Sequence, residues 1–207
     1  IIQRYRFQVR SAAGSHLTGA TTFGFFSAGA LAKQAGIQGS LPDTREISTP
    51  RNLPPPERDA LTASVTHPHR LALFEQIEVF EPNGGAHGLG FLRAANSIAP
   101  TDWYFDAHFY QDPVCPGSLG LEGFVSLVKA AAMYTWGGTL ADWTLAPELR
   151  HQWWYRGQIL PTNQRVQFEA TVTARDDAAR RLTAEGQLSV DGLVIYRMQG
   201  FAIQPVN

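Results

Sequence analysis

The chain has 207 residues, 44% of them hydrophobic, and a formal net charge of −1 at pH 7. A hydrophobic fraction of this size is typical of a globular protein that buries a sizeable core. Because positive and negative charges nearly balance, the sequence has no strong overall field that would attract nucleic acid or an anionic membrane. We therefore expect neither nucleic acid nor a membrane as a partner.

Three further features bear on the compartment and on the origin of the chain. The single cysteine, Cys115, cannot form a disulfide within the chain, which favours a reducing compartment. No run of 18 apolar residues predicts a membrane span, and the N-terminal sequence IIQRYRFQVR carries charges inside its apolar stretch, unlike a signal peptide. We therefore expect a cytoplasmic protein. Because the chain starts at Ile1 and not at Met, we also expect it to be a piece of a longer polypeptide.

Residues 1–28 are predicted to form a β-hairpin. Tyr5, Phe7 and Val9 alternate with polar residues, a turn follows at residues 12–15, and a second extended run is rich in Thr and Phe. An isolated hairpin is marginally stable in water, so this one must pack on something. Because the C-terminal strands echo it weakly, we interpret residues 1–28 as the closing hairpin of a preceding, truncated copy of the same fold. An N-terminal extension that covers a sheet edge is the alternative.

Residues 29–68 are predicted to be a linker. A short helix over residues 28–34 comes first and ends before Gly36. The rest holds six prolines with charged residues between them. This composition favours extended, poorly packed chain.

Residues 69–207 are predicted to form an α+β domain, in which a mainly antiparallel sheet wraps one long central helix. The helix, residues 117–136, is apolar on nearly every face and is therefore expected to be buried all round. Before it we expect a turn or short helix at residues 71–74, a strand from Ile77, a turn at residues 82–85, a strand at 88–95 and an irregular segment at 96–116. After it we expect strands over residues 152–160, 164–175, 180–190 and 193–203.

The residues best suited to chemistry lie in the segment 102–128. His108 follows three aromatic residues, and Gly117 begins the central helix, where backbone N–H groups lack partners and the helix dipole is positive. Glu122 stands among apolar helix residues, where a carboxylate costs several kcal/mol unless it is paired or protonated. A base, an acid and a helix N-terminus in one short stretch suit acid–base chemistry on a carbonyl compound.

Taken singly, these residues also have structural interpretations. A lone histidine beside aromatic rings is usually structural, Glu122 alone could be a solvated helix residue, and Cys115 is the type of small residue found in cores. No cluster of His, Cys and carboxylate residues has the spacing of a metal site, so we expect no metal. Trp153, Trp154 and Tyr155 are expected at core and interface positions, with one of them lining a substrate channel.

The combination of motifs in this segment is more specific than its members. Trp103-Tyr104-Phe105, His108-Phe109, Asp112-Pro113-Val114 and Pro116-Gly117-Ser118-Leu119-Gly120-Leu121-Glu122 occur at fixed offsets. This run resembles the active-site segment of the 3-hydroxydecanoyl-ACP dehydratase family and of the dehydratase domains in polyunsaturated fatty acid and polyketide synthases. The likeness extends over residues 71–204 and includes FEQIEVFEPNGGAHGLGFLRA, RGQILPT and VDGLVIY.

The resemblance implies a hot-dog fold, paired with another such unit as a double hot-dog, and a set of roles. His108 matches the catalytic histidine, Glu122 the catalytic acid, and Gly117 the residue whose backbone N–H holds the thioester carbonyl. The implied reaction converts a (3R)-hydroxyacyl chain on an acyl carrier protein to a trans-2-enoyl thioester, without metal or redox cofactor. The implied partners are the carrier protein and a second hot-dog unit, either in a homodimer or as the preceding domain. Substrate-channel positions are expected at Phe109, Val114, Cys115 and Trp154.

One departure from the family pattern limits these implications. Single-domain relatives carry Asp at the position of Glu122, whereas the synthase domains carry Glu, so isomerisation of the new double bond is not implied. Two rival functions remain open: a hot-dog thioesterase, which hydrolyses the thioester, and a catalytically silent hot-dog that only organises a synthase. The many arginines could dock an acidic carrier protein, although scattered arginines are more often plain surface residues.

Overall fold

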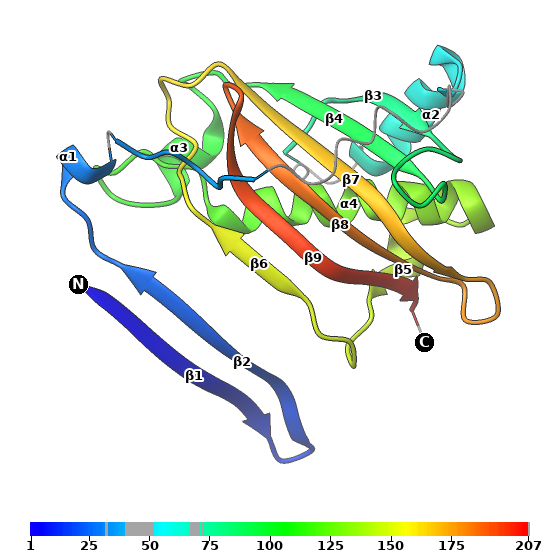
Figure 1. The fold of residues 1–207 in the computed structure, drawn as a ribbon, viewed down its shortest axis with the longest axis horizontal. Coiled ribbons are helices and arrows are strands. Elements are labelled where there is room, and N and C mark those ends of the chain that lie inside the picture. The colour runs from blue at the N-terminus through cyan, green and yellow to red at the C-terminus, as the bar shows by residue number, and fades with distance from the viewer. Residues whose placement is uncertain (32, 40–51, 67–70, 72, 207) are drawn as a thin grey trace. The chain divides into compact units, whose positions relative to one another are not determined.

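The chain folds as two compact units, an N-terminal unit, Ile1–Ala35, and a main unit, Gly36–Asn207. Figure 1 shows the computed structural model. The structure describes residues 1–31, 33–39, 52–66, 71 and 73–206.

The N-terminal unit is the predicted hairpin, made of β1 (Ile2–Ser11) and β2 (Gly14–Gly24), followed by the short helix α1 (Ala28–Leu31). Antiparallel pairing places Tyr5 opposite Thr21 and Phe7 opposite Gly19. Its larger apolar side chains are exposed within the described residues. The proposed origin of this hairpin in a preceding hot-dog unit stays a prediction.

The main unit is built on a seven-stranded antiparallel sheet, as the α+β prediction requires. The strand order is β3-β4-β7-β8-β9-β5, and β6 pairs with β9 beside it. The strands are β3 (Gln76–Glu81), β4 (Phe91–Ser97), β5 (Trp143–Leu145), β6 (Gln152–Tyr155), β7 (Arg165–Asp176), β8 (Arg181–Val190) and β9 (Leu193–Pro205).

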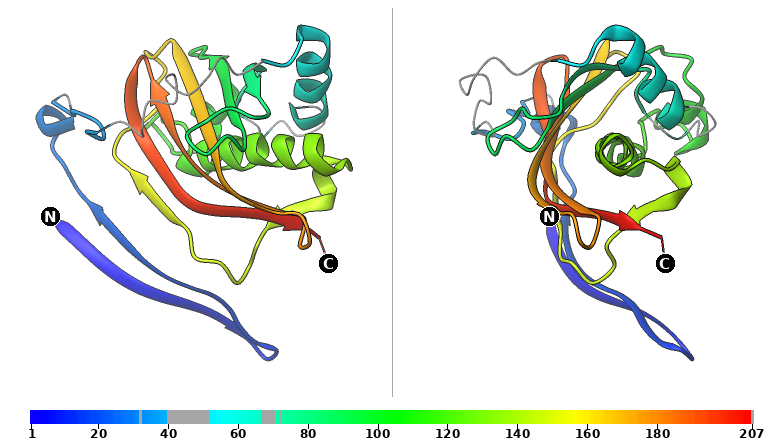
Figure 2. Two further views of the ribbon diagram at one scale, coloured as in Figure 1. Left: turned by 45° about the vertical axis from the view of Figure 1, so that its right-hand side comes forward. Right: turned by 90° about the vertical axis from the view of Figure 1, so that its right-hand side faces the viewer.

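The central helix α4 (Gly117–Trp136) has the predicted bounds and lies in the hollow of the curled sheet (Figure 2). Two glycines bring it close to the strands: a Cβ atom at Gly120 would overlap the ring of Tyr196, and one at Gly123 would lie 2.8 Å from the ring of Phe168. Phe124, which is fully buried, fills the space left by Gly186 of β8. The helix is therefore held against the sheet by close backbone approach as well as by apolar burial.

The prediction of a linker is wrong for residues 52–66, because these residues pack within the main unit. Helix α2 (Pro55–Thr66) begins with a proline, which the first turn of a helix tolerates, and it buries Thr62 and Val65. The Thr62 hydroxyl accepts a hydrogen bond of 3.1 Å from the N–H of Ile77 in β3. Residues 40–51 of the predicted linker lie outside the described part of the chain.

Other boundaries differ from prediction because short elements depend on their neighbours. Strand β6 ends at Tyr155, well before residue 160, and the predicted irregular segment contains a short helix, α3 (Trp103–Ala107). The 3-10 helix η2 (Leu140–Asp142) and β5 were not predicted. Leu71 lies in a turn, and residue 72 of the predicted short helix lies outside the described residues.

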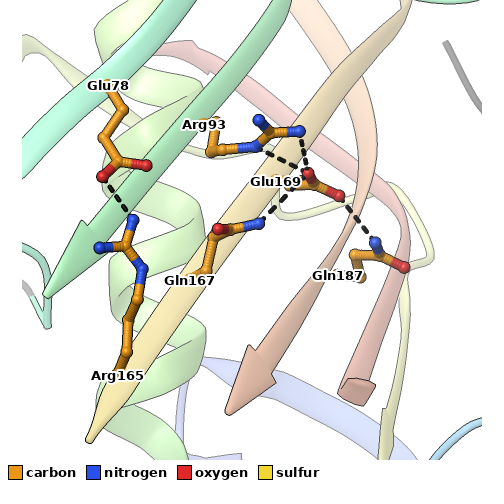
Figure 3. A network of polar contacts seen from close by, with 6 residues as sticks. All are labelled: Glu78, Arg93, Arg165, Gln167, Glu169 and Gln187. Atoms are coloured by element: carbon orange, nitrogen blue, oxygen red, sulfur yellow. Dashed lines mark hydrogen bonds and ion pairs between the residues drawn. The ribbon is translucent and has the colours of Figure 1, made fainter. Parts of the chain in front are cut away.

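The face of the sheet turned away from α4 carries a polar network (Figure 3). Arg93 of β4 donates to Glu169 of β7 through Nε at 2.9 Å and Nη2 at 2.7 Å, and Gln187 of β8 donates to the other carboxylate oxygen at 2.7 Å. Arg165 pairs with Glu78 nearby. This network joins adjacent strands and has the character of cross-strand stabilisation.

Candidate active site

His108 is positioned by the short helix that precedes it. It follows α3 directly as the C-cap residue. The Asp102 carboxylate at the start of α3 accepts hydrogen bonds from the Ala99 N–H at 2.9 Å and the Tyr104 hydroxyl at 2.7 Å. Burial, followed by the bond to Asp102, raises the pKa of Tyr104, so its hydroxyl stays a donor. These interactions hold the helix that ends at His108.

A second interaction indicates which ring nitrogen of neutral His108 carries the hydrogen. Its Nδ1 lies 2.9 Å from the carbonyl oxygen of Val114. Because a carbonyl oxygen can only accept, we assign the hydrogen to Nδ1, and in the neutral ring Nε2 then keeps its lone pair. The ring of Phe109 stacks on the imidazole with centroids 3.8 Å apart and remains exposed. His108 is thus oriented as a base that acts through Nε2.

The segment that carries the Val114 carbonyl is anchored in the core. Val114 and Cys115 are both buried, and the Cys115 N–H donates to the Ile159 carbonyl at 3.0 Å. Burial, reinforced by the negative charge of Asp102, raises the pKa of the Cys115 thiol to about 12. The thiol is therefore neutral at physiological pH and suits a core position better than a nucleophilic one.

Gly117 forms the first turn of α4 and lies against aromatic side chains. A Cβ atom there would be 3.2 Å from Cε2 of Tyr155, 3.3 Å from Cη2 of Trp153 and 3.4 Å from Oη of Tyr196. Because side chains alternate along a strand, Trp154 points to the opposite face of β6 from Trp153 and Tyr155. The structure therefore places Trp153 and Tyr155 beside Gly117, whereas the channel role expected for Trp154 stays a prediction.

Glu122 lies in the second turn of α4 and is half-buried in the single chain. The Ser126 hydroxyl donates to its Oε1 at 3.5 Å. Its surroundings are thus less apolar than the sequence pattern indicated. Among the described residues, no hydrogen bond or ion pair joins His108 to Glu122 within the chain.

Two absences among the described residues bear on other kinds of site. Within those ranges, no group of three or more His, Cys, Asp or Glu side chains is arranged to hold a metal ion. No helix in the described part of the chain is both long and apolar enough to cross a bilayer.

Comparison with known families identifies the fold and the family. The model of the FabA-like domain matches residues 65–199, which include the His108 segment and most of the sheet. The chain belongs to the FabA-like domain family. The predicted likeness to hot-dog dehydratases is therefore confirmed, as is the hot-dog fold, whereas pairing into a double hot-dog stays a prediction.

The individual relatives of this FabA-like domain either are much longer than this chain or share little sequence identity with it. A polyunsaturated fatty acid synthase subunit of Thraustochytrium sp. (strain ATCC 26185 / S-3) is 34% identical over 127 residues, which are 58% of this chain and 8% of the relative. The sigma28-regulated virulence protein Cj0977 of Campylobacter jejuni has the same fold with a TM-score of 0.51, at 8% identity over 74% of this chain and 93% of that one. The dehydratase heterocomplex ApeI:P of Xenorhabdus doucetiae has a TM-score of 0.49, at 14% identity over 76% and 93%.

Sequence reasoning missed two contributors to this region. Asp102, which anchors α3, carried a usable signal, because an acidic residue just before a short helix is a common N-terminal feature. No sequence signal indicates Tyr196, because it is far from Gly117 in the sequence. The two residues come close only in the folded chain, where β6 pairs with β9.

Proposed function

We propose that the chain dehydrates 3-hydroxyacyl thioesters carried by an acyl carrier protein, with His108 as base and Glu122 as acid. The observation that supports this most directly is the hydrogen bond between His108 Nδ1 and the Val114 carbonyl, which leaves Nε2 available to accept a proton. The family and the polyunsaturated fatty acid synthase relative support the reaction class.

In the proposed mechanism, Nε2 of His108 removes the proton α to the thioester. The N–H of Gly117 and the positive end of the α4 dipole stabilise the negative charge that develops on the carbonyl oxygen. The electrons of the broken C–H bond form the new double bond, and the 3-hydroxyl leaves as water with a proton from Glu122. The histidine then loses its proton and Glu122 regains one, which restores the site. The step needs no metal or redox cofactor.

The proposed site takes His108 and Glu122 from two different hot-dog units. This agrees with the lack of a hydrogen bond between the two residues among the described parts of one chain. The partner is either a second copy of the chain or the preceding hot-dog unit suggested by the N-terminal hairpin. Mixing His108→Ala and Glu122→Gln chains tests the first arrangement, because a homodimer would regain one intact site. Failure to regain activity, with dimers demonstrated by sedimentation, would exclude it.

The proposed activity is tested with a ladder of 3-hydroxyacyl thioesters on pantetheine and on an acyl carrier protein, read by mass spectrometry. We expect loss of water from the acyl chain, and hydration of a crotonyl thioester in the reverse direction. His108→Ala is expected to lower kcat by about 10²–10⁴-fold, the usual contribution of a positioned acid or base. Near-normal turnover in that variant contradicts the role of His108.

The same assay separates the rival functions. Release of free thiol without loss of water would indicate a thioesterase. A folded wild-type chain that neither dehydrates nor hydrates any thioester, including when paired, would indicate a silent scaffold. Carrier-protein recognition by surface arginines such as Arg150, Arg156 and Arg180 is tested by comparing KM for carrier-bound and pantetheine-bound substrate at increasing salt, because surface charge pairing is screened by ions.

A further inference from the structure

A cluster of three aromatic side chains, Trp153, Tyr155 and Tyr196, borders the N-terminal end of α4. Tyr155 of β6 stands directly opposite Tyr196 of β9 in the sheet register, with ring centroids 4.8 Å apart. Trp153 packs on both, at 5.7 Å from Tyr155 and 5.4 Å from Tyr196. All three come within 3.4 Å of the position that a Cβ atom would take at Gly117. The cluster therefore forms a wall beside the first amides of the helix.

Tyr196 differs from the other two side chains because its hydroxyl is buried without a partner in the described part of the chain. The side chain is fully buried, and its Oη has no hydrogen-bond partner among the described residues. A buried polar group without a partner is destabilising, so a hydrogen-bond partner for this hydroxyl is favoured. The nearest candidate partner is the Tyr155 hydroxyl, which, after burial, contributes to the raised pKa of Tyr196.

Tyr155 differs from Tyr196 in being accessible. Its side chain is 36% exposed, on the short strand β6, which lies beside β9 in Figure 1. Burial raises the pKa of Tyr155, as it does that of Tyr196, so both hydroxyls keep their protons in the neutral range. The N–H groups of Gly117 and Ser118 next to them have no backbone acceptor among the described residues. A partly exposed tyrosine ring and two amides without a backbone acceptor therefore lie close together.

We propose that Tyr155 donates a hydrogen bond to the thioester oxygen bound at the Gly117 amide, and that Tyr196 positions Tyr155 by donating to its hydroxyl. This assignment rests on the proposed dehydratase function. Hydrogen bonds in such a chain polarise one another, so the Tyr196 bond would strengthen the donor that meets the substrate. Tyr155 would be a substrate-binding residue and Tyr196 a positioning residue.

The test is a double-mutant cycle with Tyr155→Phe, Tyr196→Phe and the pair, measured as kcat/KM for thioester dehydration. Removal of one oxyanion donor typically costs about 10²-fold or more, so we expect a loss of that order for Tyr155→Phe. Tyr196→Phe should lose less, and it should have almost no further effect in the Tyr155→Phe background. Tyr134→Phe, which removes an exposed hydroxyl group near the other end of α4, is the matched control and should be neutral.

A spectroscopic reading separates hydrogen bonding from a purely structural effect. The carbonyl stretch of a bound, saturated ¹³C-thioester should shift to higher frequency in Tyr155→Phe, because one donor is removed. Equal effects of Tyr196→Phe in both backgrounds would overturn the positioning role. An unchanged stretch together with unchanged kcat/KM in Tyr155→Phe would overturn the donor role.

The outcome is distinguishable from failure of the proposed function. If the tyrosine variants are active and His108→Ala is inactive, the dehydratase assignment stands and the tyrosine assignment fails. If the wild-type chain shows no dehydration, the carbonyl stretch of the bound thioester still decides whether Tyr155 donates to it. Because Tyr155 is partly exposed, its phenylalanine variant remains informative even if the fully buried Tyr196→Phe variant does not fold.

Discussion

The first two turns of α4 and the turns that follow have different surroundings. The beginning of the helix contains Gly117 and Glu122, both partly accessible, and the exposed Ser118. From Gly123 to Met133 nearly every side chain is buried between the sheet and the rest of the core. Burial provides stability in proportion to the apolar area removed from water, whereas accessible polar groups contribute little to stability. Function and stability are therefore expected to respond separately to substitutions at the two ends.

The largest effect on stability is expected at the buried end. Phe124→Ala removes a fully buried ring that packs edge-on against Phe201 with centroids 5.5 Å apart. The free energy of unfolding should fall by about 3–5 kcal/mol, because the substitution leaves a cavity and removes the apolar packing of the ring. Chemical denaturation measures this, with Ser118→Ala as the exposed control in the same helix. A decrease no greater than that of the control would mean that the two ends do not differ.

Glu122→Gln, in contrast, should lower activity strongly and change stability little. Loss of this acid–base group, which accepts a proton from water in the reverse direction, is expected to lower hydration of an enoyl thioester by about 10²–10⁴-fold. The free energy of unfolding should stay within about 0.5 kcal/mol of wild type, since the side chain is half-buried and close in shape to glutamine. Steady-state kinetics and denaturation of the same preparation provide both readings. Wild-type hydration rates would remove Glu122 from the mechanism.

Gly120→Ala probes the boundary between the two ends. The added methyl group would overlap the ring of Tyr196, and overpacking of a close-packed interface costs about 1–3 kcal/mol. The higher helix propensity of alanine offsets about 1 kcal/mol of this cost. We therefore expect modest net destabilisation in denaturation experiments. A variant that is more stable than wild type would show that the helix and β9 can separate without cost.

The smallest effect on stability is expected from ionisation of the Cys115 thiol. Since its pKa is raised to about 12 from an ordinary value of 9.0, its contribution to stability is complete below pH 9 and is lost as pH rises towards 12. In the folded chain at neutral pH, alkylation by iodoacetamide should be far slower than in denaturant, because the thiol is buried and protonated. Mass spectrometry of labelled protein measures the ratio. Rapid labelling of the folded chain would contradict this assignment.

Much of both units could be predicted from local patterns. The bounds of α4, the starts and ends of β7 and β8 to within about two residues, and the N-terminal hairpin follow from periodicity and turn residues. The segment 55–66 was misjudged because its prolines suggested a linker. They precede or begin a helix whose few apolar residues find partners on β3 and α4. Local composition does not show whether such partners exist.

The sequence by itself determined the family of this chain and its three main candidate residues, His108, Gly117 and Glu122, since the motif records their types and spacing along one short segment. Only the tertiary structure decided which nitrogen of His108 is free, through its bond to the Val114 carbonyl. The tertiary structure also brought Tyr155 and Tyr196 to Gly117, because strand pairing joins residues that lie far apart in the chain. Spacing describes neighbours along the backbone, whereas hydrogen bonding and packing depend on neighbours in space.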